Sequence, residues 1–226
     1  MSTRAAAKTK ATAAKRPAAK KQPARSSAAK KPQAAAKHSK LAPDHKRTIA
    51  ISGSQSGLGL AIRKRLEAGG ARVIGIDLPG KGAEVEADLS KAEGRQAAVQ
   101  GVLDRCKGRL DGVVANAGVD AKDARLTFDV NFHGVVDLLE GLRPALAAAA
   151  PSAAVVTVSH AVMITPGLSA RAADALLADH DGRAALYAGR SPGAPYSVSK
   201  LAVARWIRGH AASAEWAGAG ISLNGV

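Results

Sequence analysis

Tyr196 and Lys200 lie four residues apart, a spacing that places both side chains on one face of a helix. A tyrosine hydroxyl normally titrates near pH ~10, which makes it a poor base at neutral pH. A neighbouring ammonium group favours the phenolate, so Tyr196 could accept a proton from an alcohol and return it to a carbonyl oxygen in the reverse direction. The pair therefore predicts acid–base chemistry at an alcohol or ketone.

Ser159 ends an apolar segment, residues 153–159, that has the composition of a β-strand. Its hydroxyl could hydrogen-bond a substrate oxygen and stabilise charge that develops there. Adjacent side chains on a strand point to opposite faces, so either Ser159 or its neighbour His160 faces the cleft, but not both. We assign the role to Ser159, and a shift of one residue would transfer it to His160.

A glycine-rich segment, SGSQSGLG, spans residues 52–59 between a predicted strand at 47–52 and a predicted helix at 58–69. Its glycines allow a tight turn, close approach of the backbone to a pyrophosphate, and close packing of helix on strand. The unpaired N–H groups of the helix N-terminus would then face the phosphates. We predict a dinucleotide site formed by Gly53, Ser54, Gln55, Ser56, Gly57, Leu58 and Gly59.

Asp77 ends the second predicted strand, residues 71–77. Its carboxylate could accept hydrogen bonds from the adenosine ribose, and it would repel a 2′-phosphate. Neither Ser54 nor Gln55 supplies a cation for that phosphate, which favours NAD over NADP. With a nicotinamide cofactor, proton transfer at Tyr196 would accompany hydride transfer.

Strand and helix patterns alternate along residues 47–226. This alternation indicates an α/β protein with a doubly wound, mostly parallel sheet and helices on both faces. A capping-box pattern, Ser90 with Glu93, marks the start of one helix. Further strands are predicted at 110–115, 153–159 and 220–226, and further helices at 90–106, 125–149 and 196–217.

Together these motifs resemble the short-chain dehydrogenase/reductase family over the whole of 47–226. The resemblance implies a Rossmann fold and adds an Asn-Ala-Gly motif and an Asp-Leu pair that contact the cofactor. It also adds a helix asparagine, Asn131, as a fourth catalytic residue that fixes a water next to Lys200, and it gives Lys200 a contact with the nicotinamide ribose. The cofactor residues added in this way are Asp88, Leu89, Asn116, Ala117, Gly118, Tyr196 and Lys200.

Three segments, SGSQSGLG, GIDLPGKGAEVEADLSKAEGR and LDGVVANAG, are most similar to bacterial 3α-hydroxysteroid dehydrogenase/carbonyl reductases. This resemblance implies a secondary alcohol or ketone as substrate, including hydroxysteroids and other bulky carbonyl compounds. We also expect a homo-oligomer. Two features depart from the family: residues 160–195 form a long connection with helical spacing at 168–180, and the sequence stops before the usual substrate loop and last strand. We interpret the domain as truncated at its C-terminus.

The formal charge of +15 arises mostly in residues 1–40, which are rich in lysine, alanine and proline and contain no acidic residue. We predict a disordered basic tail at 1–46 and an NAD-binding domain at 47–226. The tail could bind nucleic acid without sequence preference. The alternatives are a solvated extension without a dedicated partner and the product of a misassigned start codon. A transit peptide is less favoured, because lysine exceeds arginine and prolines recur.

A single cysteine, Cys106, excludes a disulfide scaffold and a cysteine-based zinc site, and we predict no metal site. No apolar run approaches the ~20 residues that span a bilayer, so we expect a cytoplasmic protein without membrane contact.

Each predicted residue also has a purely structural alternative. Tyr196 and Lys200 could lie on a solvated helix face, Ser159 and Asp77 could be turn residues, and Asn131 could face solvent. Two other functions therefore stay open: NAD binding without turnover, and tethering to nucleic acid through the basic tail.

Overall fold

The structure, a computed structural model, describes residues 46–189 and 193–226. A six-stranded sheet runs through it in the order β3-β2-β1-β4-β5-β6, and every neighbouring pair is parallel. The strand order reverses between β1 and β4, as it does in a doubly wound sheet. The strands are β1 (Thr48–Ser52), β2 (Arg72–Asp77), β3 (Val85–Glu86), β4 (Gly112–Ala115), β5 (Ser152–Val156) and β6 (Ile221–Gly225).

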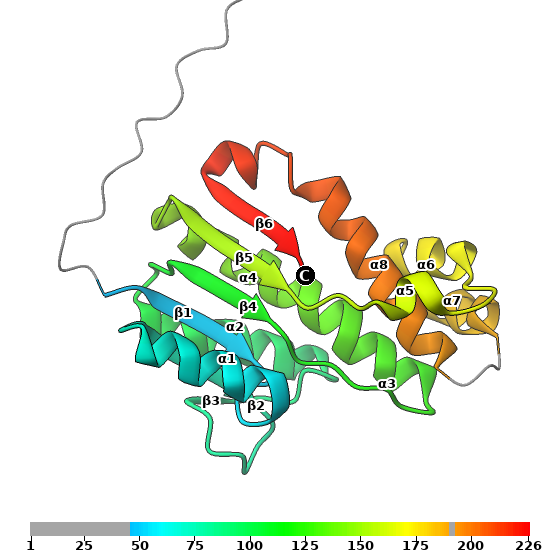
Figure 1. The fold of residues 1–226 in the computed structure, drawn as a ribbon, viewed down its shortest axis with the longest axis horizontal. Helices are drawn as coiled ribbons and strands as arrows, with labels where there is room; N and C mark the ends of the chain where they lie inside the picture. Colours follow the sequence, from blue (N-terminus) through cyan, green and yellow to red (C-terminus); the bar gives the residue numbers. More distant parts are fainter. Residues whose placement is uncertain (1–45, 190–192) are drawn as a thin grey trace, which may run out of the picture. The chain divides into compact units, whose positions relative to one another are not determined.

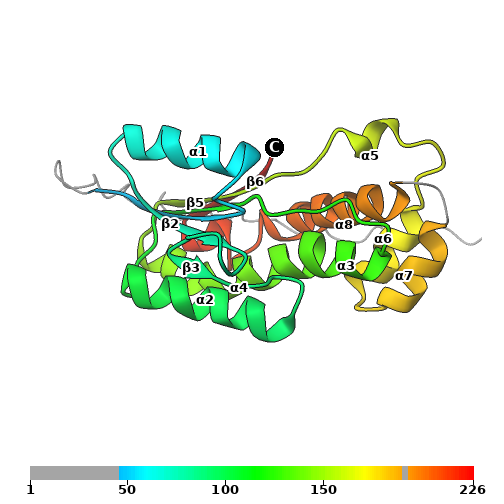
Figure 2. The same cartoon turned by 90° about the horizontal axis from the view of Figure 1, so that it is seen from below.

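Helices cover both faces of this sheet, which confirms the predicted fold class. Figure 2 shows α1 on one face and α2 with α4 on the other. The helical segments are α1 (Gly57–Ala68), α2 (Ala92–Cys106), α3 (Ala124–Phe128), the π-helix η1 (Asp129–His133), α4 (Gly134–Ala148), α5 (Ala161–Ile164), α6 (Ala170–Leu177), α7 (Asp181–Ala188), α8 (Ala194–His210) and the 3₁₀-helix η2 (Ala217–Ala219).

The hydrophobic core is divided by the sheet. Ile49 and Ile51 of β1 belong to the smaller cluster, in which Ile62 and Leu66 of α1 are partly buried. Ala50, between them, belongs to the larger cluster beneath α2, α4 and α8. Because β1 is buried on both faces, its three central residues, 49–51, are all apolar instead of alternating with polar ones, as is usual in parallel sheets.

One prediction about a helix start is wrong. Ser90 does not cap a helix: α2 begins at Ala92, and the Ser90 hydroxyl donates to the Asp88 carboxylate at 2.7 Å. Leu58, in the first turn of α1, is 58% exposed and lines the open groove at the end of the sheet.

The predicted helix at 125–149 is present, but a π-turn divides it. The segment η1 stands between α3 and α4, with Asn131 at its centre. Two other boundaries also differ. The strand predicted at 153–159 ends as β5 at Val156, and the helix predicted at 196–217 ends as α8 at His210.

The long connection after β5 folds into α5, α6 and α7, which lie around the N-terminal part of α8 (Figure 1). The helical spacing predicted at 168–180 corresponds to α6, whose Ala172, Ala175 and Leu176 are buried. The helix α7 was not predicted. It packs on α6, so the connection forms a small helical layer of its own.

Residues 1–45 lie outside the described part of the chain, so the disordered tail, its nucleic-acid binding and the domain boundary stay predictions. Among residues 46–189 and 193–226, none of the helices combines the length and apolar character needed to cross a bilayer.

Candidate active site

Two adjoining cavities follow the edge of the sheet where the strands end. One has a volume of about 550 Å³ and lies toward β2 and β3; the other, of about 350 Å³, lies toward β5 and α8. They form one groove at the position where the strand order reverses, which is where doubly wound sheets bind ligands. Both cavities are lined by Gly53, Ser56, Ala117, Gly118 and Val119.

The glycine-rich loop forms the floor between the two cavities. Gly53 and Gly57 have φ values of +68° and +49°, a backbone region that favours glycine. A Cβ on Gly59 would collide with the carbonyl oxygen of Gly53, whereas a Cβ on Gly57 would meet no atom within 4 Å. The loop is therefore tightly packed at Gly59 and open to the groove at Gly57, where the first turn of α1 borders the smaller cavity. This arrangement fits the predicted pyrophosphate.

Ser52 joins the glycine-rich loop to the loop that follows β4. Its hydroxyl oxygen accepts hydrogen bonds from the backbone N–H groups of Asn116, at 3.0 Å, and Ala117, at 3.1 Å. The predicted Asn116-Ala117-Gly118 motif thus lies against the predicted dinucleotide loop. The sequence analysis gave Ser52 no role in the site.

Asp77 lines the larger cavity and is hydrogen-bonded to the backbone of Gln55. The backbone N–H of Gln55 donates to one carboxylate oxygen of Asp77 at 2.8 Å, and that of Leu78 donates to the other at 2.9 Å. The Gln55 side chain turns away and donates to the Gly82 carbonyl. These two bonds hold the Asp77 carboxylate in a fixed orientation at the lining of the larger cavity, and its contact with a ribose stays a prediction. Ser54 is buried below the loop, and its hydroxyl has no hydrogen-bond partner among the described residues.

Asp88 and Leu89, both predicted to contact the cofactor, line the same larger cavity. One carboxylate oxygen of Asp88 accepts from both the hydroxyl and the backbone N–H of Ser90. These bonds, above all that from the hydroxyl, hold the pKa of Asp88 below its usual value. Asp88 therefore keeps its negative charge and its orientation.

Tyr196 and Lys200 line the smaller cavity together with Thr157 and Asn116. Lys200 is only 3% exposed, and its Nζ donates to the Thr157 carbonyl at 2.7 Å. The same Nζ lies 5.8 Å from the centre of the Tyr196 ring. Burial lowers the pKa of Lys200 to about 8, so the ammonium form predominates at neutral pH.

The Asn131 side chain connects three parts of the site. Its Oδ1 accepts from the Val119 N–H and its Nδ2 donates to the Val119 carbonyl, both at 2.8 Å. Nδ2 also donates to the Ser199 hydroxyl, which in turn donates to the carbonyl of Tyr196. Asn131 therefore holds α8 against the loop that follows β4. The water that we expected it to fix stays a prediction.

Ser159 lies in the loop after β5, two residues beyond Thr157. Its hydroxyl oxygen accepts from the backbone N–H of Ala161 at 3.1 Å, and His160 is exposed. Because β5 ends at Val156, the alternation of strand side chains does not decide between Ser159 and His160, and that argument was wrong.

Thr157, Val119, Ser90 and Lys81 also line the groove, and sequence reasoning missed all four. Thr157 and Ser90 lie within two residues of the predicted Ser159 and Asp88, so proximity to a motif was the available signal. Val119 contributes through its backbone, which no side-chain pattern reveals.

Comparison with known proteins agrees with this geometry. The family model for short chain dehydrogenases matches residues 47–170. A curated protein of Comamonas testosteroni, 3-alpha-hydroxysteroid dehydrogenase/carbonyl reductase, is 38% identical over 184 residues, which cover 79% of this chain and 70% of that protein. The chain therefore belongs to the short-chain dehydrogenase family and is an oxidoreductase, as predicted.

Solved structures show the same fold. The 3-alpha-hydroxysteroid dehydrogenase of Pseudomonas sp. B-0831, complexed with NADH, is 41% identical, has a TM-score of 0.71, and is matched over 79% of this chain and 70% of that one. The Pseudomonas aeruginosa protein RhlG, solved with NADP, is 22% identical with a TM-score of 0.61 over 79% of this chain and 70% of that one. At that identity the second likeness concerns the fold alone.

Proposed function

We propose that the chain is an NAD-dependent dehydrogenase or reductase that acts on a secondary alcohol or its ketone. This proposal depends mainly on one observation: residues of the glycine-rich loop and the Tyr196–Lys200 pair line the same smaller cavity. Tyr196 and Lys200 border the same space as Gly53, Gly57 and Asn116, so a proton-transferring pair adjoins the dinucleotide loop.

The groove residues fit NAD in the order in which they lie. The pyrophosphate would lie over residues 53–59, the adenosine ribose at Asp77, and the adenine beside Asp88 and Leu89. The nicotinamide end would occupy the smaller cavity beside Asn116, Ala117, Gly118, Tyr196 and Lys200. The Asp77 carboxylate supports NAD over NADP, and the relative from Pseudomonas sp. B-0831 was solved with NADH.

We assign catalytic roles to Tyr196 and Lys200, which line the smaller cavity, and to Ser159, which lies in the loop after β5 and is not among the residues that line either groove cavity. The Tyr196 hydroxyl takes a proton from the substrate alcohol, or donates one to the ketone oxygen. The Lys200 ammonium, held by the Thr157 carbonyl, stabilises negative charge on the phenol oxygen and binds the nicotinamide ribose. Ser159 orients the substrate oxygen, and Asn131 positions α8. Bound nicotinamide supplies or accepts the hydride.

The substrate class we propose is a bulky apolar alcohol or ketone such as a hydroxysteroid. The segment directly after Ser159 exposes two large apolar side chains, Met163 and Ile164, at 80% and 63%. An exposed apolar surface beside a predicted catalytic residue is suited to an apolar substrate. The names of the relatives from Comamonas testosteroni and Pseudomonas sp. B-0831 support the same class.

The chain's two tyrosines provide a matched test. We expect Tyr196→Phe to lower kcat about 10³-fold with a panel of hydroxysteroids and other secondary alcohols, because the variant has no proton to exchange. Titration of NADH fluorescence should show unchanged cofactor binding. Tyr187→Phe, which removes the other phenol, should keep its activity.

Equal turnover by Tyr196→Phe and the parent chain would refute the assigned acid–base role. NADH binding without turnover of any alcohol by the parent chain would instead support the cofactor-binding alternative. Failure of NADH to bind would refute both.

A further inference from the structure

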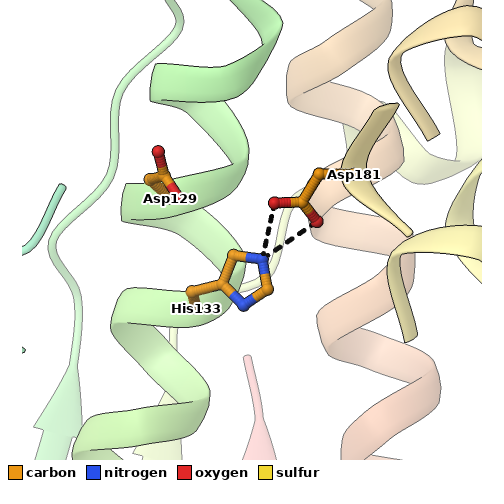
Figure 3. A group of neighbouring side chains, drawn as sticks. All are labelled: Asp129, His133 and Asp181. Carbon is orange, nitrogen blue, oxygen red and sulfur yellow. Dashed lines mark hydrogen bonds and ion pairs between the residues drawn. The ribbon is translucent and has the colours of Figure 1, made fainter. Parts of the chain in front are cut away.

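Three potential metal ligands meet away from the cofactor groove, between η1 and α7. Asp129 and His133 belong to η1, and Asp181 is the first residue of α7. Figure 3 shows the His133 ring facing Asp181, with Asp129 on the same segment as the histidine. One ligand atom from each residue lies within 4.8 Å of the other two.

The distances between His133 and Asp181 are close to those between two ligands of one metal ion. His133 Nε2 lies 3.1 and 3.2 Å from the two carboxylate oxygens of Asp181. Two ligands at the usual distances from a tetrahedral Zn²⁺ are separated by about 3.3 Å. The His133–Asp181 pair already has this spacing, and small rotations of the Asp129 side chain would bring the third ligand into range.

We propose that Asp129, His133 and Asp181 bind a divalent transition-metal ion, with Zn²⁺ as the best match. Two carboxylates and one neutral imidazole carry two negative charges, which one divalent cation balances. The imidazole favours zinc over magnesium and calcium, which prefer oxygen ligands alone. Three protein ligands leave at least one coordination position for water.

The surroundings of the cluster allow an ion to enter. The three side chains are between 17% and 24% exposed, which is partial shielding without closure. Asp181 also borders a cavity of about 490 Å³ that is lined by Arg125, His180 and Arg183 among others. Solvent ions can therefore reach the carboxylate.

Arg125 is the cation with which a metal would compete. Its Nε lies 3.7 Å from an Asp129 oxygen, and its side chain is 76% exposed. A pair at that distance and exposure contributes little stability, so a divalent ion can displace it. The Phe132 and His133 rings also form a T-shaped pair, with their centroids 5.2 Å apart.

Such an ion would connect two segments that are distant in sequence. His133 and Asp181 are separated by 48 positions, so no local sequence pattern indicates this cluster, and no metal site was predicted. The proposal goes beyond hydride transfer, because α7 carries no residue of the cofactor groove among those described. Binding to the folded chain should also stabilise it by mass action.

The test uses the full chain with Co²⁺, whose visible absorption reports coordination, and with Zn²⁺ in calorimetry. We expect one ion per chain and a Zn²⁺-dependent rise in Tm. His133→Asn and Asp129→Asn should each weaken binding at least about tenfold. Arg125→Gln should tighten it by removing the competing cation. His180→Asn is the matched control, since it removes an exposed histidine beside Asp181 and should bind as the parent does.

Circular dichroism of each variant separates lost ligands from lost folding. Weakened binding by either folded variant, His133→Asn or Asp129→Asn, with His180→Asn unaffected, supports the site. Unchanged binding in both ligand variants, or loss of binding in His180→Asn, overturns it. NADH titration of the same variants should be unchanged, so failure of the metal proposal leaves the proposed function untouched.

Discussion

The two ends of the groove, which we propose to be a cofactor end at residues 53–59 and Asp77 and a catalytic end at Tyr196 and Lys200, are built in different ways. At the cofactor end, seven consecutive residues, 53–59, form the loop after β1, and the backbone N–H of Gln55 in this loop donates to Asp77 at the end of the neighbouring strand β2. At the catalytic end, Thr157, Asn131 and Lys200 come from separate elements and meet only through packing. A binding site for a common cofactor can thus be encoded in one short motif, whereas the catalytic arrangement depends on long-range structure.

The two ends also differ in how their polar and charged groups affect the free energy of unfolding. The cofactor loop satisfies its backbone groups with glycines, the Ser52 hydroxyl and the Asp77 carboxylate. The catalytic end buries an ammonium group against a single carbonyl. Three substitutions test this contrast, beginning with the largest expected effect.

Lys200→Met should stabilise the chain at pH 7 while abolishing turnover. Its pKa falls from 10.5 to about 8 on burial, which corresponds to a cost on the order of 3 kcal/mol. Loss of the bond to Thr157 offsets about 1 kcal/mol of the gain. Urea unfolding without cofactor measures the remainder.

The pH dependence of the stability gained by Lys200→Met tests the same cost of burial independently. Between pH 8 and 10.5 the unfolded chain binds more protons at Lys200 than the folded chain does, so the parent becomes more stable as pH rises. The advantage of Lys200→Met should therefore shrink over this window. Lys64→Met, at an exposed position of α1, should show no such trend. A gain for Lys200→Met that is constant from pH 7 to 10 would contradict the cost of burial.

Gly59→Ala should damage the cofactor end. The added Cβ would collide with the Gly53 carbonyl, so we expect a loss of about 1–3 kcal/mol in the free energy of unfolding. NADH affinity should fall with it, because the loop must move. Gly209→Ala, in α8 with no atom within 4 Å of the added Cβ, should instead gain about 0.5–1 kcal/mol. Normal NADH binding by Gly59→Ala would show that the loop tolerates movement.

Asp77→Asn should have the smallest effect, and on specificity more than on stability. Removing the negative charge should shift the ratio of NADPH to NADH affinity about tenfold toward NADPH, since a 2′-phosphate is no longer repelled. Paired fluorescence titrations with the two cofactors measure this ratio. Asp104→Asn, on the exposed side of α2, should leave it unchanged. An unaltered ratio in Asp77→Asn would place the ribose elsewhere.

Much of the fold could be predicted because its signals are local. Apolar strands, a glycine-rich turn and helical spacing each depend on a few neighbouring residues, and all appear in the structure. The predictions that failed depended on competition between neighbours. The Ser90 hydroxyl could bond either a helix N-terminus or the Asp88 carboxylate, and in the structure it donates to Asp88. No sequence pattern decides such a choice.

The same limit applies to the site. Asn131 was predicted as a catalytic residue, but its bonds to Val119 and Ser199 depend on a π-turn that helical periodicity does not reveal. Thr157 was missed because it acts through its backbone carbonyl. The cluster of Asp129, His133 and Asp181 was missed because it forms only when α7 folds back on η1.

The sequence by itself determined the parallel sheet and the glycine-rich turn, because hydrophobic patterning and short-range sterics specify both. The family followed from the resemblance of several motifs in the right order, which the comparisons confirmed. Only the tertiary structure decided which polar atoms face one another in the groove and between η1 and α7. The reason is physical: a hydrogen bond or a ligand distance is set to within tenths of an ångström by the packing of whole elements, and that packing is a property of the entire core.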